Sequence, residues 1–297
     1  MDALDLVAGW PVERAAVGVM PIVGTSTPAG RRDREQLRSV GPVDRPFPWA
    51  SVTKPATALA VLVAAEEGSI ALDEAAGPEG STVRHLLAHA SGLGPDPGPP
   101  LARPGTTRIY SNAGYVVLGE LIAQRAGIPF DRYLQDGVLD PLGMAGTRLD
   151  AEGPSGGAAA GLSGPLADLL MLARELAVPT LISAETHQQA VSVQFAGVGG
   201  VLPGYGRFDP CDWGLGVEIR CRKQPHWTGV RNSPSTFGHF GGSGSFVWVD
   251  PEAGVLCSGL TDRAFGPWAV RAWPALADAL LTEVARSGAG RGPHGLA

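Results

Sequence analysis

The sequence is poor in the features that mark disulfide-rich, zinc-binding and membrane-spanning proteins. Its three cysteines, Cys211, Cys221 and Cys257, are an odd number without zinc-like spacing, so we expect free and mostly buried thiols. The longest largely apolar run, Ala56–Ala65, is far too short to cross a bilayer and is typical of a buried helix. The N-terminal stretch lacks the basic-then-apolar order of a secretory signal, and we therefore expect a cytoplasmic protein.

An excess of positive charge is also missing. The chain has 23 Lys and Arg against 29 Asp and Glu, a net charge of −6 and an isoelectric point near 5.5. Its basic residues are scattered, apart from the segment GRRDRE (Gly30–Glu35), where acidic neighbours dilute them. We therefore expect neither a nucleic-acid groove nor a basic membrane patch, and a small molecule as the partner. With 297 residues, 44% of them hydrophobic, the chain can form one large core or two closely packed lobes.

Strand signals lie at both ends of the chain. The segments that are apolar, β-branched and bounded by Gly or Pro are Arg14–Gly24, Trp213–Arg220, Gly244–Asp250 and Gly254–Thr261. The last two flank the short turn PEA and predict an antiparallel hairpin.

Helix signals lie mainly between these strands. Apolar segments with capping residues at their ends run over Ser51–Gly68, Ser81–Gly92, Asn112–Gly127 and Gly164–Val178. A last amphipathic helix, interrupted at Pro274, closes the chain, and Glu152–Pro165 is expected to be a flexible loop. This order predicts an antiparallel sheet lobe from residues 1–50 and 208–297 and a mainly helical lobe from residues 51–207. The active site would lie in the cleft between them.

Lysine is scarce as well, because the chain has two lysines, Lys54 and Lys223, and otherwise uses arginine. Lys54 follows Ser51 by three residues, which is one helical turn, so both side chains share a face. A buried lysine with a depressed pKa can accept the proton of a serine hydroxyl, whereas an arginine cannot lose its own proton. The helix N-terminus would also favour an oxyanion near Ser51. Taken alone, the pattern is more typical of a capping serine beside a solvated lysine than of a catalytic pair.

Two further motifs change this balance. Tyr110-Ser-Asn112 precedes a predicted helix, and His239-Phe-Gly241 precedes a predicted strand. With Ser-Val-Thr-Lys, they resemble the serine β-lactamase-related family, in the branch of class C β-lactamases, D,D-peptidases and esterases. Segments His85–Gly94 and Leu139–Thr147 are similar to that family in the same order, and the resemblance runs from about Phe47 to Thr261. It implies an α+β, β-lactamase/transpeptidase-like fold: an antiparallel five-stranded sheet flanked by helices, with an inserted mostly helical lobe.

The resemblance also implies roles for single residues. Ser51 would be the acylated nucleophile and Lys54 its proton acceptor. Tyr110 would share a proton with Lys54 and protonate the leaving group, and which of the two is the acting base stays open. Asn112 would hold Lys54 and a substrate carbonyl.

The third motif would supply the oxyanion side of the site. The backbone N–H groups of Ser51 and of Gly242, just past Gly241, would form the oxyanion hole, and His239 would face the cleft as a donor to Tyr110 or the substrate. No cofactor is implied. His85 and His89 are spaced like a metal-binding pair, but no third ligand suggests itself, so we expect a structural role and no metal.

The departures from the family pattern indicate the substrate. His239 and Phe240 stand where penicillin-recognising enzymes have Lys-Thr, so capture of a substrate carboxylate should be weaker. We therefore expect a serine hydrolase that acts by acyl transfer on Ser51, most simply a carboxylesterase for small esters or amides. A β-lactamase or D-amino-acid peptidase or amidase of the same fold is the alternative, and a non-catalytic binding protein is a third. Segments 70–81 and 92–106 are short for the family, which predicts an open cleft or one completed by another subunit; the oligomeric state stays open.

Overall fold

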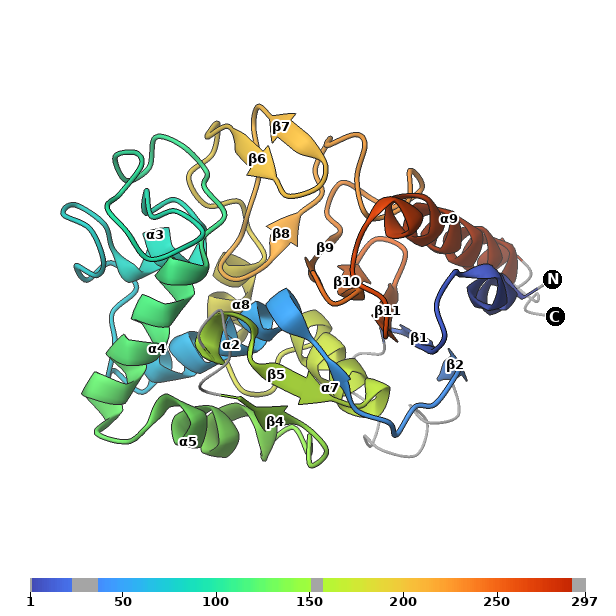
Figure 1. Ribbon diagram of the computed structural model, residues 1–297, viewed down its shortest axis with the longest axis horizontal. Coiled ribbons are helices and arrows are strands. Elements are labelled where there is room, and N and C mark those ends of the chain that lie inside the picture. Colours follow the sequence, from blue (N-terminus) through green and yellow to red (C-terminus); the bar gives the residue numbers. More distant parts are fainter. Residues whose placement is uncertain (1, 23–36, 151–156, 290–297) are drawn as a thin grey trace, which may run out of the picture.

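The computed structural model describes residues 2–22, 37–150 and 157–289. At its centre is a six-stranded antiparallel sheet (Figure 1). The strands in spatial order are β2 (Arg38–Val40), β1 (Ala15–Pro21), β11 (Val255–Thr261), β10 (Ser245–Asp250), β9 (Phe237–Gly241) and β8 (Glu218–Ile219). The two ends of the chain meet inside this sheet, since β1 pairs with β11 along its whole length.

The predicted hairpin is confirmed, with β10 and β11 joined by a tight turn and paired in antiparallel register. Every residue of both strands is buried. Such strands show no alternation of apolar and polar residues because helices cover both faces of the sheet. The expected number of five strands is wrong, because the short and largely exposed Arg38–Val40 adds a sixth strand at the edge beside β1.

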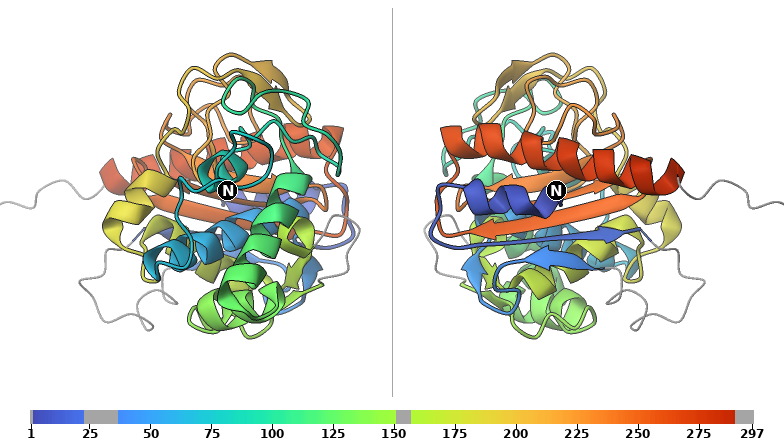
Figure 2. Two further views of the ribbon diagram at one scale, coloured as in Figure 1. Left: turned by 90° about the vertical axis from the view of Figure 1, so that its left-hand side faces the viewer. Right: turned by 90° about the vertical axis from the view of Figure 1, so that its right-hand side faces the viewer.

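Helices pack on each face of the sheet. On one face, α9 (Pro267–Ala289) lies beside the 3₁₀ helix η1 (Ala3–Gly9), as Figure 2 shows. On the other face lies α7 (Leu166–Ala177), which contacts β1, β10 and β11. The helical segment around residue 170, expected in the separate helical lobe, therefore packs on the sheet, and the division into two lobes remains a prediction. The predicted interruption at Pro274 is wrong, because α9 continues through it. The packing of α9 on the sheet offsets the one hydrogen bond that a proline removes.

The remaining helical part surrounds one helix that is buried along most of its length. Its elements are η2 (Ala50–Val52), α2 (Thr53–Glu66), α3 (Val83–Leu87), α4 (Asn112–Ala126), α5 (Phe130–Leu134), η3 (Gln135–Leu139) and α8 (Ala184–Ala190). Helix α2 is the buried one, and its residues are apolar or small nearly all round. Helix α4 begins where the Ser111 hydroxyl accepts the Gly114 N–H at 2.9 Å, and it ends at Gly127 in the left-handed conformation.

The segment expected to be a loop, Glu152–Pro165, forms regular structure in its described part. Residues 151–156 lie outside the described residues, as does the basic segment Gly30–Glu35. The part that follows forms α6 (Gly157–Ala160) and β5 (Leu162–Gly164), so the expectation is wrong there. Its small residues allow a close approach to α4, where a side chain added at Gly119 would lie 2.8 Å from Ala158. The small residues that suggested a loop are therefore required for the close packing of this segment against α4.

Three short strand pairs complete the described chain. β5 lies between β3 (Phe47–Pro48) and β4 (Arg148–Leu149), and β6 (Gly200–Leu202) pairs with β7 (Gly206–Phe208). The three cysteines are free, with Cys211 and Cys257 buried and Cys221 half-buried, as expected. Within the described ranges, no helix combines the length and apolar character that a membrane span requires.

Candidate active site

Ser51 lies in a turn held from two sides. The preceding residue, Ala50, has a φ of +46°, a left-handed conformation that a residue with a side chain rarely adopts. On one side, the Ser245 hydroxyl of β10 donates to the Trp49 carbonyl at 2.6 Å; on the other, the Trp49 indole N–H donates to the Gly164 carbonyl of β5 at 3.1 Å. These contacts fix Ser51 at the start of α2, between the sheet and the helices.

Lys54 lies one turn further along and is completely buried. Its Nζ is 2.7 Å from the Asn112 side-chain oxygen, 2.9 Å from the Ala159 carbonyl oxygen and 3.4 Å from Ser51 Oγ. Burial lowers the pKa of Lys54 from 10.5 to about 7. A neutral amine has two N–H groups, and the two carbonyl-type oxygens accept both. Its lone pair is then left for the remaining neighbour, the Ser51 hydroxyl, which is the arrangement a general base needs.

Two aromatic rings flank the same amine. Nζ lies 4.8 Å from the ring centre of Tyr110 and 5.4 Å from that of Tyr115. An aromatic face attracts a cation, and the attraction grows where water is excluded. The rings therefore stabilise the ammonium that forms when Lys54 takes up a proton.

Tyr110 precedes the N-terminus of α4. Its buried hydroxyl has no hydrogen-bond partner within the described residues. Burial raises the pKa of Tyr110 well above its ordinary value, and the nearby Ser51 hydroxyl opposes this rise only in part. The phenol therefore stays protonated near neutral pH and has a proton free to donate into the site.

His239 lies on β9 and differs from expectation in one respect. Its Nδ1 is 2.8 Å from the Phe240 carbonyl oxygen, and since a carbonyl can only accept, Nδ1 carries the proton. Burial and the neighbouring Lys54 lower the pKa of His239 to about 3, so the ring is neutral. Its Nε2 is then an acceptor, and it has no partner among the described residues. The expected donor is thus an acceptor in this structure.

The two glycines that end the third motif lie against the nucleophile. A side chain on Gly241 would come within 2.4 Å of the Trp49 carbonyl oxygen and 3.1 Å of the Ser51 backbone nitrogen, so β9 touches the Ser51 turn. Gly242 follows with open space beside its α-carbon, and both Ser51 and Gly242 line one cavity. No hydrogen bond from the Gly242 N–H occurs in the described parts of the chain. The N–H groups of these two residues thus remain candidates for an oxyanion hole in this cavity.

The cavity has a volume of about 330 Å³ and is mainly apolar. It is lined by Ser51, Tyr110, Leu202, Pro203, Gly204, Trp213, Glu218, His239, Phe240, Gly242 and Phe265. None of these lining residues is a lysine or an arginine. The one formal charge on the described wall is the carboxylate of Glu218, which the sequence analysis did not single out. The sequence analysis also missed the Ala159 carbonyl, since no motif marks a backbone group.

His85 on α3 and His89 just after it both contact neighbouring groups. His85 stacks on Phe195 with ring centres 4.2 Å apart. His89 Nδ1 accepts the backbone N–H of Ser111 at 3.1 Å, and its ring lies 4.6 Å from that of Tyr110. His89 thus orients the segment that carries Tyr110 and Asn112. Within the described ranges, no three His, Cys, Asp or Glu side chains are grouped so that they could hold a metal ion.

Known proteins share this architecture. The family model described as Beta-lactamase matches residues 3–281, nearly the whole chain. A solved beta-lactamase from Mycobacterium bovis is 50% identical, with a TM-score of 0.87 over 95% of this chain and 99% of that one. EstCE1, described as a hydrolase with promiscuous acyltransferase activity, has a TM-score of 0.71 over 94% of this chain and 96% of its own, and at 19% identity it shows the fold alone.

A curated relative is more distant. A protein from Salmonella heidelberg (strain SL476) named D-alanyl-D-alanine carboxypeptidase is 27% identical over 207 residues, which are 56% of this chain and 47% of the relative. The chain spans about half the length of the curated relatives it matches. Fold and site together define a β-lactamase/transpeptidase-like protein with a serine beside a buried lysine. The chain belongs to the Beta-lactamase family.

Proposed function

We propose that this protein is a serine hydrolase, a carboxylesterase that cleaves small esters or amides through an acyl-enzyme on Ser51. The charge of the cavity supports this choice. An enzyme that recognises a penicillin or a peptide C-terminus needs a cation for the substrate carboxylate. Here the corresponding position holds neutral His239, the lining residues include no Lys or Arg, and Glu218 contributes a negative charge.

Acylation would begin with the neutral amine of Lys54. Its Nζ takes the proton of Ser51, and Oγ attacks the substrate carbonyl carbon. The carbonyl oxygen becomes an oxyanion that the N–H groups of Ser51 and Gly242 stabilise; losing one such donor typically costs about 3–4 kcal/mol. When the bond to the leaving group breaks, Tyr110 donates its proton to the departing oxygen or nitrogen and regains one from the Lys54 ammonium.

Deacylation would reverse these roles with water as the nucleophile. Water enters the position that the leaving group has vacated and loses a proton to the neutral Lys54. The second oxyanion collapses, and the proton returns to Ser51 Oγ as the carboxylic acid leaves. Asn112 contributes by accepting from Lys54 in each state, which keeps Nζ aimed at Ser51. No separate carboxylate base is required.

The names of relatives support a second candidate, a β-lactamase or D-alanyl-D-alanine carboxypeptidase. Both activities use the same serine chemistry on a substrate that carries a carboxylate. The two candidates therefore differ in what the cavity binds rather than in how Ser51 reacts.

Turnover and labelling experiments separate these possibilities. We expect p-nitrophenyl butyrate to be hydrolysed by the native chain and by Ser39→Ala, a matched change at an exposed serine, but not by Ser51→Ala. Mass spectrometry after a fluorophosphonate probe should place the adduct on Ser51. Without that adduct and without turnover, the protein would be a binding protein that retains the fold. Nitrocefin or a D-Ala-D-Ala peptide cleaved faster than the esters would favour the second candidate.

A further inference from the structure

The cavity beside Ser51 is walled mainly by apolar side chains. Most of the residues that line it are aromatic or aliphatic: Tyr110, Trp213, Phe240, Phe265, Leu202 and Pro203. Its volume of about 330 Å³ is small for a ligand pocket and suits a group about the size of one ring. The cavity can therefore enclose either the acyl part or the alcohol part of a small ester.

Two of the lining rings pack against buried tryptophans. The ring centres of Phe240 and Phe265 are 4.9 Å apart. Trp273 lies 5.4 Å from Phe265 and 6.1 Å from Phe240, and Trp227 lies 5.7 Å from Phe240. Both tryptophans are buried, so the two lining rings are supported from within the protein. The apolar wall is thus formed before a substrate arrives, which lowers the entropic cost of binding.

The turn between β6 and β7 packs against the same rings. Residues 202–204 of this turn line the cavity, and the ring of Tyr205 lies 6.1 Å from those of Phe240 and Phe265. An atom added at Gly204 would come within 2.6 Å of the Phe265 ring, so the turn and this ring are in direct contact. Together they form one continuous apolar surface.

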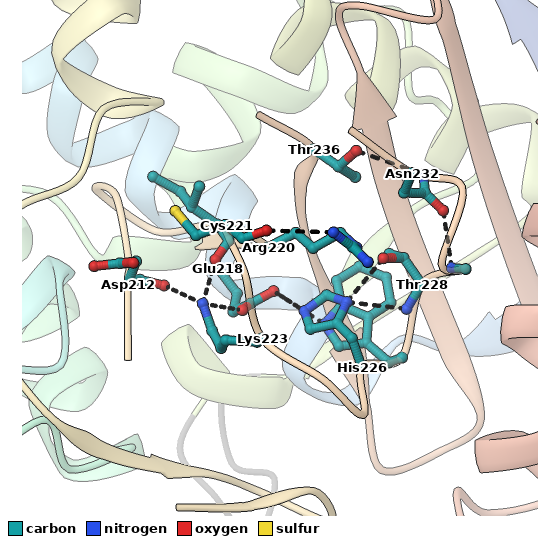
Figure 3. A network of polar contacts seen from close by, with 12 residues as sticks. Asp212, Glu218, Arg220, Cys221, Lys223, His226, Thr228, Asn232 and Thr236 are labelled. Carbon is teal, nitrogen blue, oxygen red and sulfur yellow. Dashed lines mark hydrogen bonds and ion pairs between the residues drawn. The ribbon is translucent and has the colours of Figure 1, made fainter. Parts of the chain in front are cut away.

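The charged residue on the cavity, Glu218, is fully occupied by neighbours of its own (Figure 3). Its Oε1 is 2.7 Å from Lys223 Nζ, and its Oε2 accepts the side-chain N–H groups of His226 at 2.9 Å and Trp227 at 3.1 Å. Burial alone would raise the pKa of Glu218, but the interactions with His226 and Lys223 outweigh it and hold the pKa at about 2. Glu218 is therefore an anion with both oxygens paired.

Lys223 balances this charge and is saturated as well. Besides its ion pair with Glu218, it donates to the carbonyl of Asp212 at 3.0 Å and to that of Ile219. All three N–H groups of its ammonium are thus engaged. The ion pair leaves neither a cation for a substrate carboxylate nor a free anion for a substrate ammonium.

The other polar side chains on the cavity are few. Ser51 and Tyr110 serve the reaction, and neutral His239 offers one acceptor nitrogen. A charged end of a substrate would lose its hydration here without gaining a counter-ion, which is unfavourable. An apolar group, in contrast, gains free energy when it leaves water for such a surface.

We propose that this cavity binds one bulky apolar group, about the size of a substituted phenyl ring, and that the preferred substrates are esters carrying such a group in the acyl or the alcohol part. Phe265 is then a specificity-determining residue, because its ring touches both Phe240 and the turn at Gly204. It takes no part in bond breaking. This inference rests on the proposed esterase function and names its substrate class.

Two series of alkyl esters provide the test, since they lack the aromatic leaving group of p-nitrophenyl esters. The acyl series compares ethyl 3-(4-methylphenyl)propanoate with ethyl propanoate, and the alcohol series compares 2-(4-methylphenyl)ethyl acetate with ethyl acetate. After correction for the rate of each ester with hydroxide, kcat/KM should favour the ring-bearing ester by about tenfold or more in at least one series. The series that shows the preference identifies the part of the substrate that occupies the cavity.

A charged analogue of matched size completes each series. Replacing the 4-methyl group by a 4-carboxylate should remove most of the tenfold gain, because the wall offers no cation. Equal rates for the ring-bearing and ring-free esters in both series would overturn the proposal. A carboxylate ester cleaved as fast as its methyl counterpart would also overturn it.

Variants then assign the preference to the wall. Phe265→Ala should lose most of the preference for the ring-bearing ester, and Phe265→Leu, which restores apolar volume, should keep more of it. Phe208→Ala, the same change on β7 at a residue that does not line the cavity, should match the native chain. Fluorophosphonate labelling of Ser51 shows that each variant is folded, and a labelled Phe265→Ala with an unchanged preference would refute the role of Phe265. If the native chain cleaves none of the esters and Ser51 takes no label, the esterase proposal itself has failed.

Discussion

Replacing Lys54 by Met should show how much the depressed pKa of this lysine changes the free energy of unfolding. Met has a similar length and no charge, so the substitution removes the titrating group while keeping most of the packing. In the native chain, burial holds the pKa of Lys54 at about 7, against 10.5 for an ordinary lysine. Between these two values the unfolded chain binds a proton that the folded chain does not.

The sign and size of the effect follow from this difference. Stability rises with pH wherever the unfolded state binds more protons, so the native chain should gain stability from pH 7 upward and approach its full value near pH 10.5. Each pKa unit corresponds to 1.36 kcal/mol, which gives a gain of about 2 kcal/mol between pH 7 and pH 9. The Lys54→Met variant lacks this contribution. The stability of the variant, measured relative to that of the native chain, should therefore be higher at pH 7 than at pH 9.

The assay is urea unfolding followed by tryptophan fluorescence at pH 7, 8 and 9. The free energy of unfolding of the native chain minus that of Lys54→Met should increase by about 2 kcal/mol over this range. Arg125→Met, which removes an exposed cation, serves as the control and should show no such trend. Parallel pH dependences of the native chain and Lys54→Met would refute the depressed pKa and, with it, the neutral amine as the base.

Two other outcomes follow from the same geometry. Because acylation requires the neutral amine, kcat/KM for p-nitrophenyl butyrate should rise about tenfold per pH unit below pH 7 and level off above it; a flat profile from pH 5 to 8 would contradict Lys54 as the proton acceptor. In Gly241→Ala, the new methyl group would lie 2.4 Å from the Trp49 carbonyl oxygen, so β9 must move away from Ser51. We expect at least a hundredfold loss of kcat, with little change for Gly266→Ala, where the added atom meets open space; unchanged turnover in Gly241→Ala would show that the oxyanion hole lies elsewhere.

The catalytic residues of the site could be predicted from the sequence, whereas the residues that surround them could not. The spacing of Ser51 and Lys54 is a helical turn, a local property, and the structure brings both together with Tyr110 and Asn112. The depressed pKa of Lys54 could also be predicted, because a lysine can accept the proton of a serine hydroxyl only if its pKa is lowered. The Glu218–Lys223 pair carries no motif, because it depends on how the chain folds after β8, and a lysine and a glutamate in sequence are normally solvated.

The wrong predictions about the fold have a similar origin. Residues 157–164 have the composition of a loop, but α2 and α4 leave room only for small side chains there, so tertiary packing decides their structure. The sixth strand, β2, is three residues long and mostly exposed, and nothing but its pairing with β1 makes it a strand. Pro274 is compatible with a continuous helix because α9 side chains on both sides of it, Trp273 and Leu276, are buried in one cluster with residues of the sheet.

The partnership of β1 with β11 determines when this protein can fold during synthesis. Val17, fully buried in the finished protein, is aligned with Gly259, so it lacks this neighbour until more than two hundred further residues have been made. Helices made meanwhile hold Ser51 and Lys54 but lack the strand that carries Gly242. The nucleophile therefore stays inactive on the nascent chain, and the apolar segment that forms β1 must be kept from aggregating until β11 has been made.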